Sequence, residues 1–294
     1  MLKRLALVLL ALLPLSARAE GGKLPVVASF SVLDDLVQQI GGDDVEVDTL
    51  VGCDGDAHVY QPSPGDARKL VAARLFVVNG LGLEGWMARL IASAGFKGRV
   101  VTATEGIVPL QTEVNGKASP DPHAWQDLAN GRIYVRNIAA ALAATDPDHA
   151  ADYARRASAY QAQLAELDTW VRTQIATIPE GQRRIITTHD AFHYFGRAYG
   201  IEFSAPVGMS EESEPNAGAV AALIRQIRQD HIGALFIENM TDPRLIEQLA
   251  HETGATLGGS LFADALSKPG EGGESYQAMF RHNVPEMVAA MARN

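Results

Sequence analysis

The sequence contains very little cysteine, since Cys53 is the only one in 294 residues. A lone cysteine excludes an internal disulfide, and it also excludes a metal cluster built on thiolates. Any metal site in this chain must therefore use histidine and carboxylate ligands. We expect Cys53 itself to be a small, half-buried apolar residue rather than a functional thiol.

Basic residues are also in short supply, because 25 Lys and Arg stand against 35 Asp and Glu, for a formal net charge of -10. Loss of residues 1–19 would remove three positive charges and leave a net charge of about -13. A protein this acidic is poorly suited to bind a polyanion. The composition therefore argues against nucleic acid as a partner.

Long apolar runs are absent beyond the first residues, so the sequence predicts no membrane-spanning helix in the mature chain. Two basic residues at positions 3 and 4 precede an apolar run from Leu5 to Leu15, and Ala17-Arg18-Ala19 follows as a cleavage site. We expect residues 1–19 to be a signal peptide that is cleaved after Ala19. No cysteine directly follows that site, so we expect an exported, soluble protein without a lipid anchor.

Strand and helix patterns then alternate along the chain, which is typical of α/β folds with mostly parallel sheets. Within residues 20–147, Ser63 and Pro64 predict the start of a helix, because they supply a cap and a first-turn proline. The other predicted elements are strands at 23–30, 45–51, 74–80 and 98–104 and helices at 31–40 and 84–95. Residues 111–120 are expected to form a short loop.

Residues 148–178 contain neither glycine nor proline, and their apolar residues recur at helical spacing. A single helix of this length would span about 45 Å. We interpret residues 148–180 as one long rigid helix that joins two α/β domains, at 20–147 and 181–294. The alternative is a peripheral helix within one larger domain.

The alternation of strands and helices resumes in residues 181–294. The predicted strands lie at 183–188, 201–207, 234–239 and 255–261, and the predicted helices at 190–200, 216–230, 242–254 and 275–293. The expected fold class is therefore α/β, with two domains whose sheets are mostly parallel.

Three of the eight histidines, His58, His123 and His189, stand beyond the ends of predicted strands, and the carboxylates Glu238 and Asp264 do so as well. In open α/β sheets, ligands bind outside the carboxyl ends of the strands. A single histidine there is more often a hydrogen-bonded loop residue, but the joint placement predicts a metal site. The remaining histidines are expected at the surface or in the core: His149, His193, His231, His251 and His282.

His189 also begins the stretch H-D-A-F-H, which is close to the H-E-x-x-H motif of zinc proteases. In that motif both histidines lie on one helix with a glutamate base between them. Here Asp190 is one methylene shorter, Tyr199 replaces the third histidine of the extended motif, and residues 183–188 are predicted as a strand. The protease interpretation is therefore disfavoured, and His193 is expected to be a buried histidine or a partner of a ligand.

Five segments, in order, resemble the solute-binding proteins of zinc and manganese ABC importers. They are "GDAHVYQPSPGDARKL" at 55–70, "DPHAWQD" at 121–127, "TTHDAFHYFGRAYG" at 187–200, "GMSEESEPNA" at 208–217 and "LFADAL" at 261–266. The resemblance covers the whole mature sequence. There are two departures: many zinc-specific relatives carry a long His- and Asp-rich loop where residues 111–120 are short, and Ala57 replaces the proline common before the first ligand.

The resemblance implies a metal bound in the cleft between the two domains by four ligands, His58, His123, His189 and Asp264. It implies Zn(II), because manganese-importing relatives often carry a carboxylate at the position of His189. Asp190 and His193 receive no ligand role. By position alone, the candidates for orienting the ligand rings are Asp121, Asp127, Asp190 and Glu238.

The function that the resemblance implies is high-affinity zinc binding in the periplasm and delivery to an ABC permease in the inner membrane, with no enzymatic activity. A periplasmic zinc donor protein is a further candidate partner, and a monomer is expected. Because imidazoles must lose protons to bind metal, the affinity should fall below about pH 6.5.

Two other functions compete with this interpretation. A zinc hydrolase would hold the metal with the three histidines and use Asp264 or Glu238 as a base towards bound water. A closed four-ligand site leaves no position for that water, so the coordination number separates the two. A surface adhesin, the weaker alternative, would need an anchor that the sequence does not display.

Overall fold

The computed structural model describes residues 22–114, 117–208 and 217–294, so the expected signal peptide lies outside the described residues. The described strands form two four-stranded sheets, in which all neighbours are parallel, and one antiparallel hairpin. The expected α/β class with two parallel sheets is confirmed. Within these ranges, none of the helices combines the length and apolar character that crossing a bilayer requires.

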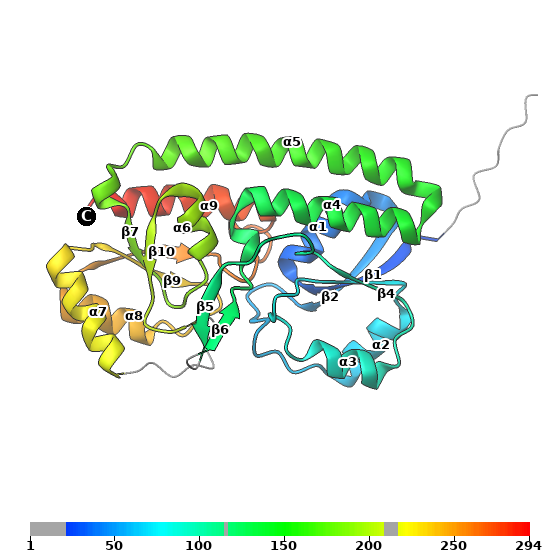
Figure 1. The fold of residues 1–294 in the computed structure, drawn as a ribbon, viewed down its shortest axis with the longest axis horizontal. Helices are drawn as coiled ribbons and strands as arrows, with labels where there is room; N and C mark the ends of the chain where they lie inside the picture. Colours follow the sequence, from blue (N-terminus) through cyan, green and yellow to red (C-terminus); the bar gives the residue numbers. More distant parts are fainter. Residues whose placement is uncertain (1–21, 115–116, 209–216) are drawn as a thin grey trace, which may run out of the picture.

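The first sheet comes from the N-terminal half (Figure 1). Its strands are, in spatial order, β2 (Val45–Val51), β1 (Leu24–Phe30), β3 (Leu75–Val78) and β4 (Arg99–Thr102). The segments between these strands form α1 (Ser31–Gly41), η1 (Gly42–Asp44), α2 (Pro64–Ala72) and α3 (Met87–Ala94). As predicted, α2 begins behind a cap, in which Ser63 and Asp66 each accept the other's backbone N–H.

The second sheet comes from the C-terminal half. Its strands are, in spatial order, β10 (Thr256–Leu261), β9 (Ala234–Glu238), β7 (Arg184–Ile186) and β8 (Glu202–Ser204). Its helical segments are η4 (Glu180–Gln182), α6 (His193–Tyr199), α7 (Ala217–Asp230), α8 (Arg244–Thr253) and α9 (Tyr276–Met291). As predicted, α8 ends before Gly254, whose φ of 75° suits glycine.

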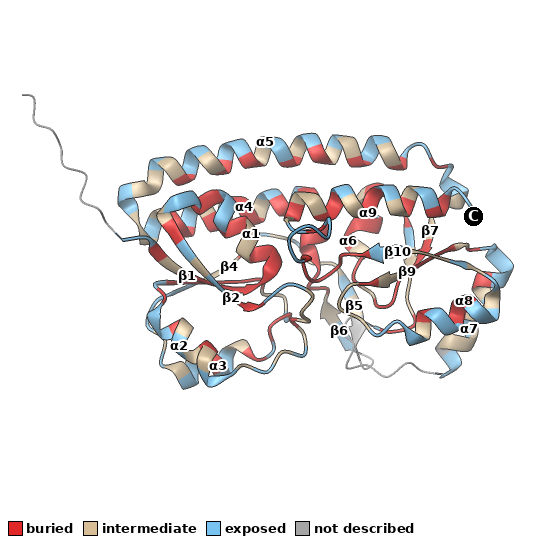
Figure 2. Ribbon diagram, turned by 180° about the vertical axis from the view of Figure 1, so that it is seen from behind, coloured by how far each residue is buried: buried red, intermediate tan, exposed pale blue. Residues whose placement is uncertain are grey.

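The long helix α5 (Ala150–Ile175) follows η3 (Pro147–His149) and lies across both halves of the molecule (Figure 1). It packs on α1, on α9 and on α4 (Leu128–Thr145). The buried face of α5 is turned towards these helices (Figure 2), and its members recur every three or four residues: Tyr153, Ala157, Tyr160, Leu164, Leu167, Val171 and Ile175. The predicted long helix is confirmed.

The apolar core is continuous from one half to the other. One buried cluster contains Phe76 from the first sheet, Leu164 from α5 and Phe236 from the second sheet. A smaller cluster, which includes Leu235 and Leu249, lies between the second sheet and the helices α7 and α8. The two halves therefore share buried packing beneath α5 as well as the covalent connection through it.

Two segments differ from the sequence prediction. The expected loop at 111–120 contains β5 (Gln111–Val114) and β6 (Lys117–Pro120), which pair antiparallel. Helix α4 was not predicted at all. A Cβ atom at Gly131 in α4 would stand 2.4 Å from the hydroxyl of Tyr276, so glycine lets α4 approach that side chain closely.

Candidate metal centre

His58 lies in the loop that follows β2. Its backbone N–H donates to Asp56 Oδ1 at 2.7 Å, and Trp86 Nε1 donates to the carbonyl of Ala57 at 2.8 Å. Downstream, the loop runs into the capping box that starts α2. These contacts hold the loop to the N-terminal half and leave the His58 side chain 9% exposed.

His123 follows the hairpin and directly precedes η2 (Ala124–Gln126). Asp121 Oδ1 accepts the backbone N–H of His123 at 2.9 Å and lies 2.8 Å from its Nδ1. Asn79 Nδ2, at the end of β3, donates to the carbonyl of Pro122 at 2.9 Å. The ring of His123 is fully buried. Its orientation is fixed by the contact of Nδ1 with Asp121, and Nε2 is left to face a metal ion.

His189 follows β7, and its backbone forms a parallel bridge with Val207. Glu238 Oε1 accepts the backbone N–H groups of Thr188 and His189, at 2.9 and 3.1 Å. Glu238 Oε2 lies 2.6 Å from His189 Nδ1, and the two form an ion pair when the ring is protonated. Because α6 begins only at His193, the two histidines do not share a helix, and the zinc-protease arrangement is excluded.

Asp264 follows β10 and is fully buried. The carbonyl of its neighbour Ala263 accepts two hydrogen bonds, from Trp125 Nε1 at 2.9 Å and from Gln126 Nε2 at 2.8 Å. The two donors stand two and three residues after His123. One carbonyl oxygen therefore joins the segment of His123 in the first half to the segment of Asp264 in the second.

The four predicted side chains meet where the carboxyl ends of the two sheets face each other. The Nε2 atoms of His58, His189 and His123 lie 3.2, 3.1 and 3.6 Å from Asp264 Oδ2. His58 Nε2 and His123 Nε2 are 3.2 Å apart, and all four ligand atoms lie within 4.8 Å of one another. A tetrahedral zinc ion with ligands at about 2.0–2.2 Å separates them by about 3.3–3.6 Å.

Two histidines of the centre have raised pKa values, so their rings must lose protons before a cation binds. Burial lowers the pKa of His123, but Asp264 and Asp121 more than reverse this and raise that pKa to about 9. Burial likewise lowers the pKa of His189, while Glu238 and Asp264 raise it well above its ordinary value. Burial raises the pKa of Asp264, yet His123 and His189 hold it well below the usual range. Asp264 Oδ1 is buried and has no hydrogen-bond partner among the described residues.

Two of the four candidates for orienting the rings do contact one, namely Asp121 and Glu238. The expectation for Asp127 is wrong, because its side chain caps α4 by accepting the backbone N–H of Ala129 at 2.9 Å. Asp190 lies 3.8 Å from His193 Nε2 and has no recorded contact with a ligand ring in the described part of the chain.

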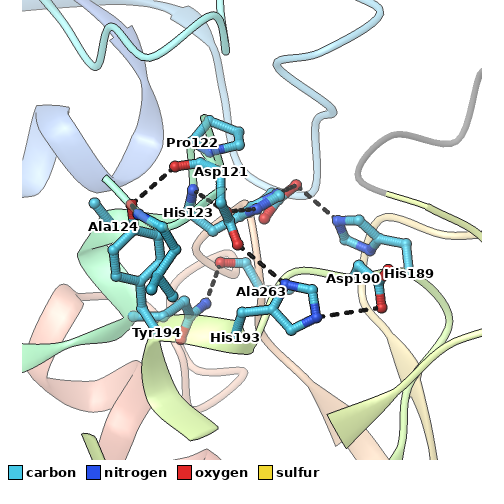
Figure 3. A network of polar contacts seen from close by, with 12 residues as sticks. Asp121, Pro122, His123, Ala124, His189, Asp190, His193, Tyr194 and Ala263 are labelled. Carbon is cyan, nitrogen blue, oxygen red and sulfur yellow. Dashed lines mark hydrogen bonds and ion pairs between the residues drawn. The ribbon is translucent and has the colours of Figure 1, made fainter. Parts of the chain in front are cut away.

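His193 contacts Asp121, the residue that orients the ring of His123, rather than a candidate ligand itself. Its Nδ1 lies 3.2 Å from Asp121 Oδ2, on the far side of the carboxylate that holds His123 (Figure 3). The side chain of His193 is 35% exposed. The expectation of a buried or ligand-supporting histidine is therefore met only indirectly.

Among the residues outside the centre, His231 and His251 are exposed, as expected. His149 is half-buried instead, with Nδ1 2.6 Å from Asp146 Oδ2. The expectation that Cys53 is half-buried is wrong, because this side chain is exposed at the start of the loop that carries His58.

The family described as "Zinc-uptake complex component A periplasmic", or ZnuA, matches residues 26–290. This chain belongs to the ZnuA family. The curated relatives include the "Manganese-binding lipoprotein MntA" of Halalkalibacterium halodurans, which is 34% identical over 275 residues, covering 93% of this chain and 90% of the relative.

Solved structures of similar proteins share the fold as well as the sequence. The "periplasmic zinc binding protein TroA" from Treponema pallidum has 32% sequence identity and a TM-score of 0.87, covering 92% of this chain and 99% of TroA. The manganese-bound periplasmic metal-binding protein from Candidatus Liberibacter asiaticus has 31% identity and a TM-score of 0.82, covering 92% of this chain and 100% of that one.

The ZnuA-family assignment makes this chain the metal-binding component of an ABC importer and not an enzyme. The zinc hydrolase alternative receives no support from the family. The fit of the donor set to a divalent cation agrees with this function, because the ligand atoms of three imidazoles and one carboxylate lie within 4.8 Å of one another.

Proposed function

We propose that this protein captures Zn(II) in the periplasm and delivers it to an ABC permease in the inner membrane. The observation that carries the proposal is the convergence of His58, His123, His189 and Asp264 at distances suited to one small cation. We assign these four residues as the ligands. The metal is the cargo of the protein, so the site must bind it tightly and also release it.

The choice of zinc rests on the chemistry of the donors. Three imidazole nitrogens suit Zn²⁺, whereas Mn²⁺ prefers oxygen ligands and stands well below zinc in the general order of affinities. The relatives named above do not decide between the metals, since one is named for manganese, one for zinc, and one is manganese-bound. The separations of 3.2 Å between His58 Nε2 and His123 Nε2 and of 3.6 Å between His123 Nε2 and Asp264 Oδ2 are compatible with a tetrahedral zinc ion.

The protein's own residues supply the means of holding the cation. Three neutral imidazoles and one carboxylate leave a net charge of +1 when a divalent ion binds. Glu238 and Asp121, each beside the Nδ1 atom of a ligand ring, offset this charge and keep the rings in the tautomer that presents Nε2. Because the four ligands complete the coordination shell, we expect no position for a reactive water.

The location follows from the first residues and from the family. We propose export to the periplasm with cleavage after Ala19, a monomeric mature protein, and delivery of zinc to the importer's permease, with a periplasmic zinc donor as a further candidate partner. Curated relatives such as MntA are named lipoproteins, but the only cysteine here is Cys53. The mass and N-terminal sequence of the protein recovered from the periplasm test this: Glu20 as the first residue is expected, and an acylated chain would contradict it.

Single substitutions test the ligand assignment. Changing His58, His123, His189 or Asp264 to Ala should weaken zinc binding at least about 10-fold, because no equal donor replaces the lost one. His251→Ala, at an exposed position on α8, is the control and should leave the affinity unchanged. Competition titration against a chelator gives the constants. An affinity equal to wild type in any ligand variant would remove that residue from the site.

A further inference from the structure

Asp54 reaches from the first half of the molecule to the second. Its Oδ1 accepts a hydrogen bond from Asn239 Nδ2 at 2.9 Å, and its Oδ2 lies 3.1 Å from Lys268 Nζ. Its backbone N–H donates to the carbonyl of Leu266 at 3.1 Å. We call Asp54, Asn239 and Lys268 the clasp.

The members of the clasp are adjacent to the candidate ligands along the chain. Asp54 precedes His58 in the loop after β2, and Asn239 directly follows Glu238, the partner of His189. Lys268 lies in the segment that follows Asp264. The clasp therefore connects the loop of His58 to both segments that supply the opposite side of the site.

The segment of Asp264 is fixed to the first half by buried contacts that do not involve the clasp. The carbonyl of Ala263 accepts from Trp125 and Gln126, and the backbone N–H of Leu266 donates to Ser31 Oγ at 2.9 Å. Buried hydrogen bonds cost more to break than an exposed ion pair. In the clasp, the side chains of Asp54 and Lys268 are 26% and 66% exposed. The clasp is thus weaker than the buried hydrogen bonds that fix the segment of Asp264 to the first half.

His58 is also where the site meets solvent. Its side chain is 9% exposed, while those of His123, His189 and Asp264 are fully buried. His58 lines a cavity of about 930 Å³ that extends between its loop and the helices α2 and α3. Of the four candidate ligands, only His58 lines this cavity within the described residues. A metal that leaves through this cavity would therefore pass His58.

We propose that Asp54 is a positioning residue that keeps the loop of His58 closed over bound zinc, so that the clasp sets the rate of metal release. This inference rests on the proposed zinc-binding function, because it assigns a task to a residue that touches no metal. Opening the clasp frees the one partly exposed ligand and leaves the other three in place. Asp54 acts on release more than on capture, since an open loop still admits the ion.

Asp54→Gly is the variant that tests the clasp with the least damage to the fold. Asp54 has a φ of 56°, which glycine adopts without strain, so the loop backbone and its bond to Leu266 are retained while the side-chain contacts are lost. The measurement is stopped-flow release of zinc from the loaded protein into excess chelator. We expect release about 10-fold faster than in the wild type, as suits the loss of a hydrogen bond to a charged group. The association rate should stay within about twofold, as is usual within one set of variants.

Three further variants separate a positioning role from a general loss of structure. His231→Gly also places a glycine at a positive φ, here 53°. His231 follows α7, which supplies no residue of the site, so this variant should release zinc at the wild-type rate. Asp54→Asn keeps an acceptor for Asn239 but loses the charge that faces Lys268, and should be intermediate. Lys268→Ala alone should quicken release only about two- to fivefold, and should have no effect on top of Asp54→Gly.

The outcomes divide cleanly. Faster release from Asp54→Gly, with an unchanged association rate and an unchanged melting temperature of the metal-free protein, supports the clasp. Release at the wild-type rate overturns it, and so does a parallel fall in association rate and melting temperature, which would mark a purely structural residue. A wild-type protein that binds no zinc would instead defeat the proposed function, and this result is visible before any variant is made.

Discussion

Glu238 holds His189 at two points, because one carboxylate oxygen accepts the backbone N–H of His189 and the other lies 2.6 Å from its Nδ1. Both residues are fully buried, so the ring cannot turn without breaking an ion pair that solvent does not replace. The remaining ring nitrogen, Nε2, is thereby aimed at Asp264 Oδ2, 3.1 Å away. Glu238, at the end of β9, thus determines the direction of the proposed ligand His189, which follows β7.

Glu238→Gln should weaken zinc binding by about 10- to 100-fold, the usual cost of losing a carboxylate that orients a ligating histidine. The amide oxygen of Gln can still accept the two backbone N–H groups, so the loop remains folded while the ring loses its negative partner. Isothermal titration against a competing chelator measures the constant. The matched control is Glu202→Gln. Glu202 lies on β8, is exposed and pairs with Arg184 of β7. A Glu238→Gln protein with wild-type affinity would show that His189 needs no orienting group.

Asp121 and His193 provide a second comparison along one chain of contacts. Asp121→Asn should weaken zinc binding by about 10-fold or more, because Asp121 contacts the ring of His123 directly. His193→Ala should cost less than about threefold in affinity, since the half-buried contact of His193 reaches the metal only through Asp121. The same titration distinguishes the two. A larger effect from His193 than from Asp121 would reverse this order of contacts.

Zinc binding should release protons at neutral pH. The pKa of His123 in the metal-free protein is raised to about 9, so its ring is protonated at pH 7 and must lose that proton to bind zinc. The apparent affinity should therefore be greatest above about pH 9 and decline as the pH falls through that value, rather than only below about 6.5 as the sequence alone led us to expect. Calorimetry in buffers of different ionisation enthalpy counts the protons. Fewer than one proton released per zinc at pH 7 would contradict the charged state assigned to the centre.

The selectivity between zinc and manganese should depend on His189. The wild type should bind manganese at least about 100-fold more weakly than zinc, because three nitrogen donors give manganese no advantage over the general order of affinities. His189→Glu should narrow that gap, mainly by weakening zinc. Competitive dialysis with both metals, followed by elemental analysis, measures the ratio. Comparable affinities in the wild type would place this protein with its manganese-binding relatives.

Much of the fold was accessible from the sequence because strands, caps and glycine stops are local signals. Ser63 and Pro64 marked the start of α2, and Gly254 marked the end of α8. Helix α4 was missed because Asn130-Gly131 is a typical turn pair. Its glycine is required by the distant side chain of Tyr276, and no local pattern contains that information.

The strands β5 and β6 were also missed, but in their case the sequence contained a local signal. The sequence of the expected loop at 111–120 contains Asn115-Gly116 between two short polar segments, and Asn-Gly is a strong hairpin signal. The signal for β5 and β6 was therefore present and was passed over. The absence of a long apolar strand on either side of the pair explains why the segment resembled a loop.

In the candidate site, the convergence of His58, His123, His189 and Asp264 could be predicted, but most of the contacts that support these side chains could not. Glu238 and Asp121 were found because both stand at positions close to strand ends or ligands in the sequence. The tie from Trp125 to the carbonyl of Ala263 depends on the docking of one half on the other, which sequence spacing does not encode. Asp54 is of the same kind, since its partners Asn239 and Lys268 lie in the other half of the chain.

The central claim is that one zinc ion is held by three imidazoles and one carboxylate. Zinc K-edge X-ray absorption of the protein loaded with one equivalent tests it most directly. We expect four nitrogen and oxygen neighbours at about 2.0–2.1 Å, with the multiple scattering typical of three imidazoles, and two such rings in His58→Ala. Five or six oxygen neighbours, or a spectrum that does not change when His58 is replaced, would contradict the account.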